Sequence, residues 1–261
     1  MENAIEVVGL VTHYGDREIL KNISLSIPKG KTTVILGGSG CGKSTLLRHL
    51  IGLLKPTRGS ILINGRDITV MKESELNEVR KKFGMLFQGA ALLNSLSIAD
   101  NVALPVKEHT RLEDSTIQIM VRMKLDLVGL SGFGGFFPSQ LSGGMKKRAG
   151  IARAMALDPE IIFFDEPSAG LDPVTAAGLD ELILKLRDVF KMTIVVVTHE
   201  LMSIFMIADY VIMLDAGSVI FSGTLEELKA SGHPRIKMFL DRQAENENYN
   251  PEDYLKIIAG E

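Results

Sequence analysis

The run Gly37-Gly38-Ser39-Gly40-Cys41-Gly42-Lys43-Ser44 says more about the fold of this chain than any other stretch. It matches the pattern G-x-x-x-x-G-K-[ST], in which glycines allow consecutive backbone N–H groups to point at phosphate oxygens. Lys43 is expected to reach the β- and γ-phosphates of a nucleotide, and Ser44 to offer its hydroxyl to Mg²⁺. A plain glycine-rich turn shares this composition, so the flanking sequence has to support the phosphate loop.

The flanking sequence has the alternation of an α/β fold. Residues 32–36 form an apolar, β-branched run before the glycines, and residues 43–54 have a helical pattern after them. Residues 161–164 and 193–197 are continuously apolar, as in parallel strands buried on both faces. Between them, residues 176–190 repeat apolar side chains at helical spacing. We therefore predict a mostly parallel sheet flanked by helices, with the phosphate loop between a strand and a helix.

The remaining segments predict additions to this core. Short apolar runs broken by turn residues in 1–30 indicate an antiparallel N-terminal sheet, and residues 210–221 indicate a β-hairpin. Residues from about 89 to 159 have a mostly helical pattern, which predicts an inserted helical subdomain. We assign residues 1–240 to one domain and residues 241–261 to a C-terminal extension, a polar linker followed by a short helix. The apolar face of that helix is expected to dock on a partner or on the other protomer.

The composition excludes several classes of protein. The chain has 261 residues, of which 46% are hydrophobic, enough for a packed core. Its 29 Lys and Arg against 32 Asp and Glu give a formal net charge of −3, so no nucleic-acid partner is expected. The basic runs Arg80-Lys81-Lys82 and Lys146-Lys147-Arg148 are interpreted as solvated helix faces. A single cysteine excludes a disulfide framework and fits the cytosolic side of a cell.

The chain is not expected to cross a membrane by itself. The longest apolar candidate, residues 192–214, is interrupted by Thr198-His199-Glu200 and by Asp209, so it predicts two buried segments instead of a span. The first residues lack the basic and apolar regions of a secretory signal. Any membrane role must then come through a partner.

Two acids, Asp165 and Glu166, directly follow the predicted strand 161–164. Carboxylates at the end of a buried strand are costly unless cations or hydrogen-bond donors meet them, and a Mg²⁺–nucleotide complex is such a partner. Asp165 suits a magnesium role, and Glu166 suits a general base that activates the attacking water. A structural salt bridge or a helix cap would be the ordinary explanation for these acids without the phosphate loop.

Four further residues are weak signals on their own. His199 follows the strand 193–197 at the sheet edge where ligands gather, yet a single histidine there is commonly structural. Tyr14 and Gln88 are equally weak, since an aromatic residue near a strand end is commonly part of the core and a glutamine after Phe87 is commonly on the surface. Cys41 lies at a helix N-terminus beside Lys43, which predicts a lowered thiol pKa and inactivation by thiol reagents, although its ordinary role would be that of a small filler residue.

The segment Leu141-Ser142-Gly143-Gly144-Met145, with Ser168-Ala169-Gly170-Leu171-Asp172 after the acids, unites these signals. Here the chain resembles the ABC ATPases, a family of P-loop NTPases, and the match in motif order runs from Tyr14 to His199. The resemblance implies ATP and Mg²⁺ as cofactors and catalytic roles for Gln88, Glu166 and His199. It implies magnesium contacts at Ser44, Gln88 and Asp165. It implies nucleotide contacts at Tyr14, Gly37, Gly38, Ser39, Gly40, Cys41, Gly42, Lys43, Ser44, Thr45, Ser142, Gly143, Gly144 and Asp172.

The signature-like segment also has chemistry of its own. Ser142 is the expected N-cap of a helix, and Gly143-Gly144 expose backbone donors to an anion; a simple capped helix would look the same. In the ABC fold this helix start serves the nucleotide of a second copy, so the resemblance implies a head-to-tail dimer with two composite sites. Met145 departs from the family's usual glutamine, and this variant resembles the ATPases of Mla- or Mce-type lipid transporters.

That resemblance implies the partners and the location. It implies transmembrane permease subunits, points to an Mce-type substrate-binding protein and a small regulatory subunit, and places the chain at the cytoplasmic face of the inner membrane. Three alternatives stay open: an importer ATPase for another small cargo, a non-transport ABC ATPase and a small-molecule P-loop kinase. The second would need coiled-coil heptads or two cassettes, and the third leaves Asp172 and the segment around Ser142 without a role.

Overall fold

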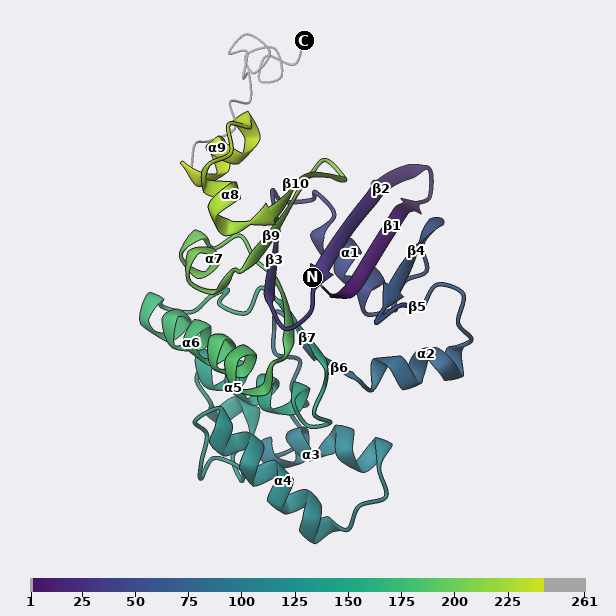
Figure 1. Cartoon of the computed structure of the whole chain (residues 1–261). Helices are drawn as coiled ribbons and strands as arrows, with labels where there is room; N and C mark the ends of the chain where they lie inside the picture. The colour runs from purple at the N-terminus through teal and green to yellow at the C-terminus, as the bar shows by residue number, and fades with distance from the viewer. Residues whose placement is uncertain (1, 242–261) are drawn as a thin grey trace, which may run out of the picture. The chain divides into compact units, whose positions relative to one another are not determined.

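The computed structural model describes residues 2–241 (Figure 1). The chain divides into two compact units, Met1–Leu225 and Glu226–Glu261. The smaller unit contains most of α8 (Leu225–Lys229) and all of α9 (Pro234–Leu240). The predicted linker and terminal helix after residue 241 lie outside the described residues. Everything that forms the candidate site belongs to the larger unit.

A six-stranded sheet organises the larger unit and has the order β10-β9-β3-β8-β7-β6. Neighbouring strands run parallel except β9 and β10, which form the predicted hairpin. Its turn contains Ala216 and Gly217, both at positive φ, as a tight hairpin turn requires. The strands are β3 (Thr32–Gly37), β6 (Phe83–Leu86), β7 (Ile161–Asp165), β8 (Thr193–Val197), β9 (Tyr210–Asp215) and β10 (Ser218–Thr224).

A second sheet is antiparallel, with the order β2-β1-β4-β5, which confirms the predicted N-terminal sheet. It consists of β1 (Asn3–Tyr14), β2 (Arg17–Pro28), β4 (Arg58–Ile63) and β5 (Arg66–Asp67). β1 and β2 are each 12 residues long, whereas the sequence pattern predicted several short runs. Register shifts along their pairing break the polar–apolar alternation, and Gly9 with φ +59° lies within one of them.

The helices are distributed unevenly around the main sheet. α1 (Lys43–Leu50) follows the phosphate loop and contacts β2, β3 and β8, so its apolar face joins the cores of both sheets. Between β6 and β7 the chain forms only helices, and α3 and α4 lie side by side at the end of this unit away from β1 and β2 (Figure 1). The remaining helices are α2 (Glu73–Arg80), α3 (Ile98–His109), α4 (Asp114–Leu127), η1 (Pro138–Gln140), α5 (Gly143–Ala154), α6 (Pro173–Phe190) and α7 (Leu201–Ile207).

The central strands are buried along nearly their whole length. Every residue of β3 and β8 is buried, and β7 is buried up to Asp165. This arrangement explains the continuous apolar runs, since helices cover the faces of a parallel sheet. Among residues 2–241, no helix combines the length and hydropathy that a membrane span needs.

Candidate active site

The phosphate loop begins where β3 ends and is held against neighbouring backbone. Gly37 has φ +151°, and a Cβ atom there would lie 2.2 Å from the carbonyl oxygen of Leu214 on β9. Gly42 has φ +106° and immediately precedes α1; a Cβ atom there would lie 2.7 Å from Leu20. A side chain at Gly37 would collide with the backbone of β9, and at Gly42 the positive φ itself favours glycine. The loop is therefore fixed at both ends.

The middle of the loop is open. Gly38, Ser39 and Gly40 are exposed, and a Cβ atom at Gly38 or Gly40 would meet no atom within 4 Å. Ser44 is exposed in the first turn of α1, while Thr45 is buried behind it. Exposed backbone N–H groups in front of a helix N-terminus form an anion site, and the first turn of α1 contains no acidic residue to oppose one.

Lys43 is bound by its own loop. Its ammonium group donates hydrogen bonds to the carbonyl oxygens of Gly37 at 2.8 Å and Gly38 at 2.9 Å. These are main-chain acceptors without formal charge, which a phosphate can replace as the stronger partner. The side chain is thus already folded over the loop.

Cys41 differs from the sequence-based prediction. Its side chain is buried, and this burial raises the pKa of the thiol, against the lowering effect of Lys43. Its Sγ lies 4.0 Å from the Lys43 ammonium. The prediction of a lowered thiol pKa is therefore wrong, because desolvation outweighs the helix N-terminus and the nearby cation.

Asp165 ends β7 with its carboxylate half-buried. Burial raises the pKa of Asp165, and the neighbouring Glu166 raises it further, whereas Arg48, Lys147 and Lys43 lower it. The carboxylate thus lies within electrostatic reach of cations from α1 and from α5. A divalent cation at this point would favour the ionised form much more strongly.

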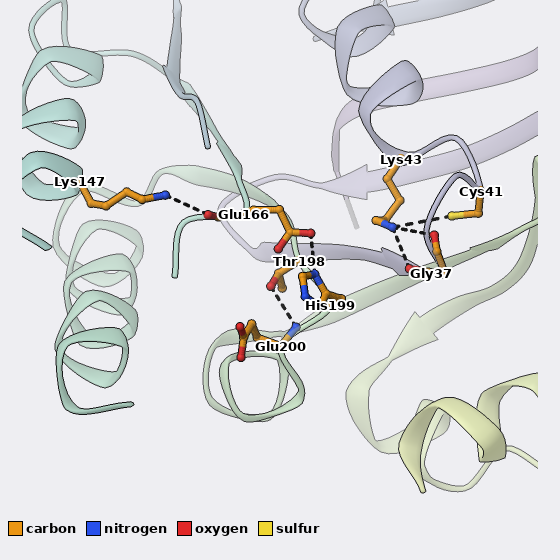
Figure 2. A network of polar contacts seen from close by, with 9 residues as sticks. Gly37, Cys41, Lys43, Lys147, Glu166, Thr198, His199 and Glu200 are labelled. Atoms are coloured by element: carbon orange, nitrogen blue, oxygen red, sulfur yellow. Dashed lines mark hydrogen bonds and ion pairs between the residues drawn. The ribbon is translucent and has the colours of Figure 1, made fainter. Parts of the chain in front are cut away.

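Glu166 and His199 are brought together by the register of β7 and β8. Asp165 pairs with Val197, and the N–H of Glu166 donates to the carbonyl oxygen of Val197 at 2.8 Å. Glu166 itself has φ +47°, an uncommon conformation for a side-chain-bearing residue. His199 Nδ1 then donates to Oε1 of Glu166 at 2.8 Å (Figure 2).

The second carboxylate oxygen of Glu166 has no partner. Oε2 is buried without a hydrogen bond, and the side chain of Glu166 is only 13% exposed, whereas that of His199 is 61% exposed. An unpartnered buried carboxylate oxygen is costly unless a ligand or water meets it. Together with the open loop and the half-buried Asp165, this orphaned oxygen fits a site for a Mg²⁺-bound triphosphate and an attacking water.

Ser142, Gly143 and Gly144 form the start of α5 on a different part of the unit. Ser142 is the N-cap, with Oγ accepting from the N–H of Met145 at 3.3 Å. A Cβ atom at Gly144 would lie 2.4 Å from Cγ2 of Thr175, so this glycine allows α5 to approach α6. Ser142 and Gly143 remain exposed.

Asp172 caps the neighbouring helix. Its Oδ1 accepts from the N–H groups of Val174 at 3.1 Å and Thr175 at 3.0 Å, and hydrogen bonds with Thr175 lower the pKa of Asp172. The two predicted motifs around Ser142 and Asp172 are therefore adjacent in one chain. Gln88 is exposed after β6, and Tyr14 is 45% exposed at the end of β1.

The family described as ABC transporter matches residues 20–169, more than half of the chain. The chain belongs to the ABC transporter family. The ATP-binding protein MlaF of the intermembrane phospholipid transport system of Haemophilus influenzae is 44% identical over 98% of each chain. A probable ribonucleotide transport ATP-binding protein, mkl, of Mycobacterium leprae is 46% identical over 91% of this chain and 69% of its own length.

Solved structures of ATP-binding cassettes share the fold. One cassette, in a dimeric post-hydrolysis state bound to ADP and Pi, is 32% identical over 85% of this chain and 98% of its own, with a TM-score of 0.78. This ABC subunit is thus an ATPase of the cassette type, with the P-loop α/β fold that the sequence predicted.

Lys147 is the residue of this ATPase that the sequence interpretation missed. The run Lys146-Lys147-Arg148 was interpreted as a solvated face, but Lys147 is buried, with 5% of its surface exposed. Its ammonium donates to the carbonyl oxygens of Gln88 and Glu166, the latter at 3.1 Å. Arg148 donates to the carbonyl oxygens of Val128 at 3.1 Å and Gly178 at 2.9 Å. One sequence signal could have indicated that Lys147 lies on the buried face of its helix. The residues three and four positions away from it are small or apolar: Gly144, Gly150 and Ile151.

Proposed function

We propose that this ATPase drives a transporter that moves phospholipid between membranes. The observation that supports ATP hydrolysis as the driving reaction is the Glu166–His199 pair at the ends of β7 and β8, with a buried carboxylate oxygen left free for water. The cargo rests on the similarity to MlaF along 98% of both chains. The Met145 variant of the signature-like segment is consistent with it.

The residues divide the work of hydrolysis. The loop from Gly37 to Ser44 binds the phosphates through its N–H groups, and Lys43 exchanges its loop carbonyls for phosphate oxygens. Glu166 takes a proton from the attacking water, while His199 orients the carboxylate through Oε1. The γ-phosphorus gains the water oxygen as the bond to ADP breaks, and inorganic phosphate leaves.

A magnesium ion fits the donor set at the same site. Ser44, Asp165 and Gln88 would hold it, and it would neutralise charge that develops on the phosphate oxygens. Tyr14 would stack on the base, and Thr45 would support Ser44 from its buried position. The exposed Ser142 and Gly143, with Asp172 beside them, would meet the nucleotide bound to a second copy.

We infer the assembly from the same features. A head-to-tail dimer would bring each phosphate loop to the exposed start of a partner's α5. The dimeric cassette of similar fold supports a dimer. Residues from about 89 to 159 would form an inserted helical subdomain, and transmembrane permease subunits would be partners of the chain. The chain would then work at the cytoplasmic face of the inner membrane, with an Mce-type substrate-binding protein and a small regulatory subunit as further components.

A different cargo is the second candidate function. The mycobacterial relative is described as a probable ribonucleotide transport ATP-binding protein and is 46% identical. The catalytic residues would act identically in that case, because none of them contacts the cargo.

The test is reconstitution in two steps. Glu166→Gln should retain ATP binding and slow hydrolysis by about two to four orders of magnitude. The permease proteins that co-purify with the chain are then reconstituted in liposomes with fluorescent phospholipid or radiolabelled ribonucleotide. ATP-dependent movement of phospholipid, absent with Glu166→Gln, is the expected result. Movement of ribonucleotide alone would replace the lipid cargo, and an unimpaired Glu166→Gln would reject the general base.

A further inference from the structure

Lys147 is a buried cation that connects three segments of the candidate site. It belongs to α5, a little more than one turn after Ser142, and its ammonium donates to the main-chain oxygens of Gln88 and Glu166. Gln88 follows β6 and Glu166 follows β7, which are neighbouring parallel strands. Figure 2 shows the side chain reaching Glu166 from the side away from Lys43. One side chain thus fixes the distance between two loops.

The position is unfavourable for a lysine unless its partners compensate. Burial lowers the pKa of Lys147, and the nearby carboxylates of Asp165 and Glu166 act in the opposite direction. A buried ammonium with two carbonyl acceptors and two carboxylates nearby is stabilised as a cation only while those loops keep their places. A neutral apolar side chain would fill the space but hold neither loop.

The backbone that Lys147 holds is itself strained. Glu166, whose carbonyl oxygen Lys147 bonds, has φ +47°. Ala90 and Ala91, shortly after Gln88, also have positive φ, +61° and +49°, but their carbonyl oxygens accept from Arg153. Conformations of this kind persist when surrounding contacts determine them. The carbonyl of Glu166 is held from α5, while its N–H is held from β8. Both bonds determine where the carboxylate points.

We propose that Lys147 is a positioning residue for ATP hydrolysis, which acts on Glu166 by tying its main chain to that of Gln88 in the arrangement that the chemistry needs. The inference rests on the proposed function of Glu166 as the general base. It also gives α5 a direct mechanical connection to the catalytic loop. A movement of the exposed helix start at Ser142 would be transmitted to Glu166 through Lys147, which lies on the same rigid helix.

The experiment compares variants of the full-length chain. Lys147→Met should lower kcat by about 10- to 100-fold and leave KM for ATP within about twofold, because binding by the phosphate loop is untouched. Lys147→Arg should restore most of kcat, since its guanidinium offers several donors to the same carbonyls. Lys146→Met is the matched control: it removes a charge from the same helix and should keep the parental rate. Thermal unfolding confirms that each variant is folded, and Lys147→Gln replaces Lys147→Met if the latter is not.

A second comparison separates positioning from general loss of structure. Single-turnover hydrolysis is measured for Glu166→Gln with and without Lys147→Met. If Lys147 acts through Glu166, the second substitution should change the residual rate less than about threefold. The same 10- to 100-fold loss in both backgrounds would overturn the proposal, as would a rise in KM with kcat unchanged.

The two proposals fail in different ways. If Glu166→Gln is slow and Lys147→Met is not, only the role of Lys147 is rejected. If Glu166→Gln hydrolyses ATP at the parental rate, the general base is rejected, and with it the route by which Lys147 acts.

Discussion

Gly144→Ala tests the contact between α5 and α6 directly. A Cβ atom at this position would lie 2.4 Å from Cγ2 of Thr175, and the next atom, Thr175 Cβ, would be 3.8 Å away. A contact below 3 Å must be relieved by movement. Thr175 can rotate about χ1, but that rotation moves its hydroxyl away from Asp172, with which the side chain is hydrogen-bonded.

The magnitude follows from two opposing terms. Overpacking a close contact costs about 1–3 kcal/mol, while Gly to Ala in a helix contributes about 1 kcal/mol of stability. Gly144→Ala should therefore lower the free energy of unfolding by about 0–2 kcal/mol. In a Thr175→Ser background, which removes Cγ2 and keeps the hydroxyl, the same change should be neutral or stabilising by up to about 1 kcal/mol.

The assay is a double-mutant cycle by urea and thermal unfolding. The expected coupling between the two positions is about 1–3 kcal/mol, and each kcal/mol corresponds to roughly 2–4 °C in Tm for a unit of this size. ATP hydrolysis should fall with Gly144→Ala and recover in the double variant. Equal destabilisation in both backgrounds would refute the reasoning, because it would mean that Thr175 Cγ2 is not the obstacle.

Three further outcomes are expected. Folding lowers the pKa of His49 from 6.5 because the ring is buried. The neutral ring therefore stabilises the fold above pH 6.5, and this stabilisation is lost as the pH falls below 6.5, at up to about 1.4 kcal/mol per pH unit. His49→Gln should reduce this pH dependence of the free energy of unfolding, measured with urea. Asp165→Asn should raise the Tm of the nucleotide-free protein at neutral pH and abolish hydrolysis, because a carboxyl whose pKa is raised by burial is destabilising when ionised; a lower Tm would show that its charge is satisfied. Mixing inactive Lys43→Ala and Ser142→Glu chains should recover vanadate trapping at one site per dimer, whereas no recovery in proven heterodimers would exclude composite sites.

The sequence predicted those parts of the fold that are fixed by local pattern. The strand, loop and helix around Lys43 follow from the positions of the glycines and from the β-branched apolar run before them, and both features can be recognised in the sequence. The register that joins Glu166 to His199 is not, because it depends on two strands separated by α6. The resemblance gave each residue a catalytic role, but only the structure showed that the two side chains are hydrogen-bonded.

Residues whose role depends on burial were the ones missed. The sequence indicated a solvated cation at Lys147 and a lowered thiol pKa at Cys41. Both side chains are buried, so Lys147 is not solvated and the pKa of Cys41 is raised. Asn101 is a third case: it is fully buried in α3 and bonds main-chain groups of Leu93, Leu96 and Ser97. Its side-chain amide holds the main chain of residues 93–97 in place, and no pattern in the neighbouring sequence predicts these hydrogen bonds.

The pairing of β7 with β8 also dictates where this chain can change in length. The two strands match residue for residue, from Ile161 opposite Thr193 to Asp165 opposite Val197. Deleting one residue from β8 would pull His199 back by about 3.3 Å and turn it to the other face, away from its carboxylate partner. The exposed segment at residues 111–113, between α3 and α4, belongs to no strand, so its length does not affect the register of the sheet. An epitope or fluorescent tag inserted there would leave the pairing of β7 with β8, and so the contact between Glu166 and His199, unchanged. Whether this protein tolerates a change in length therefore depends on where the change is made.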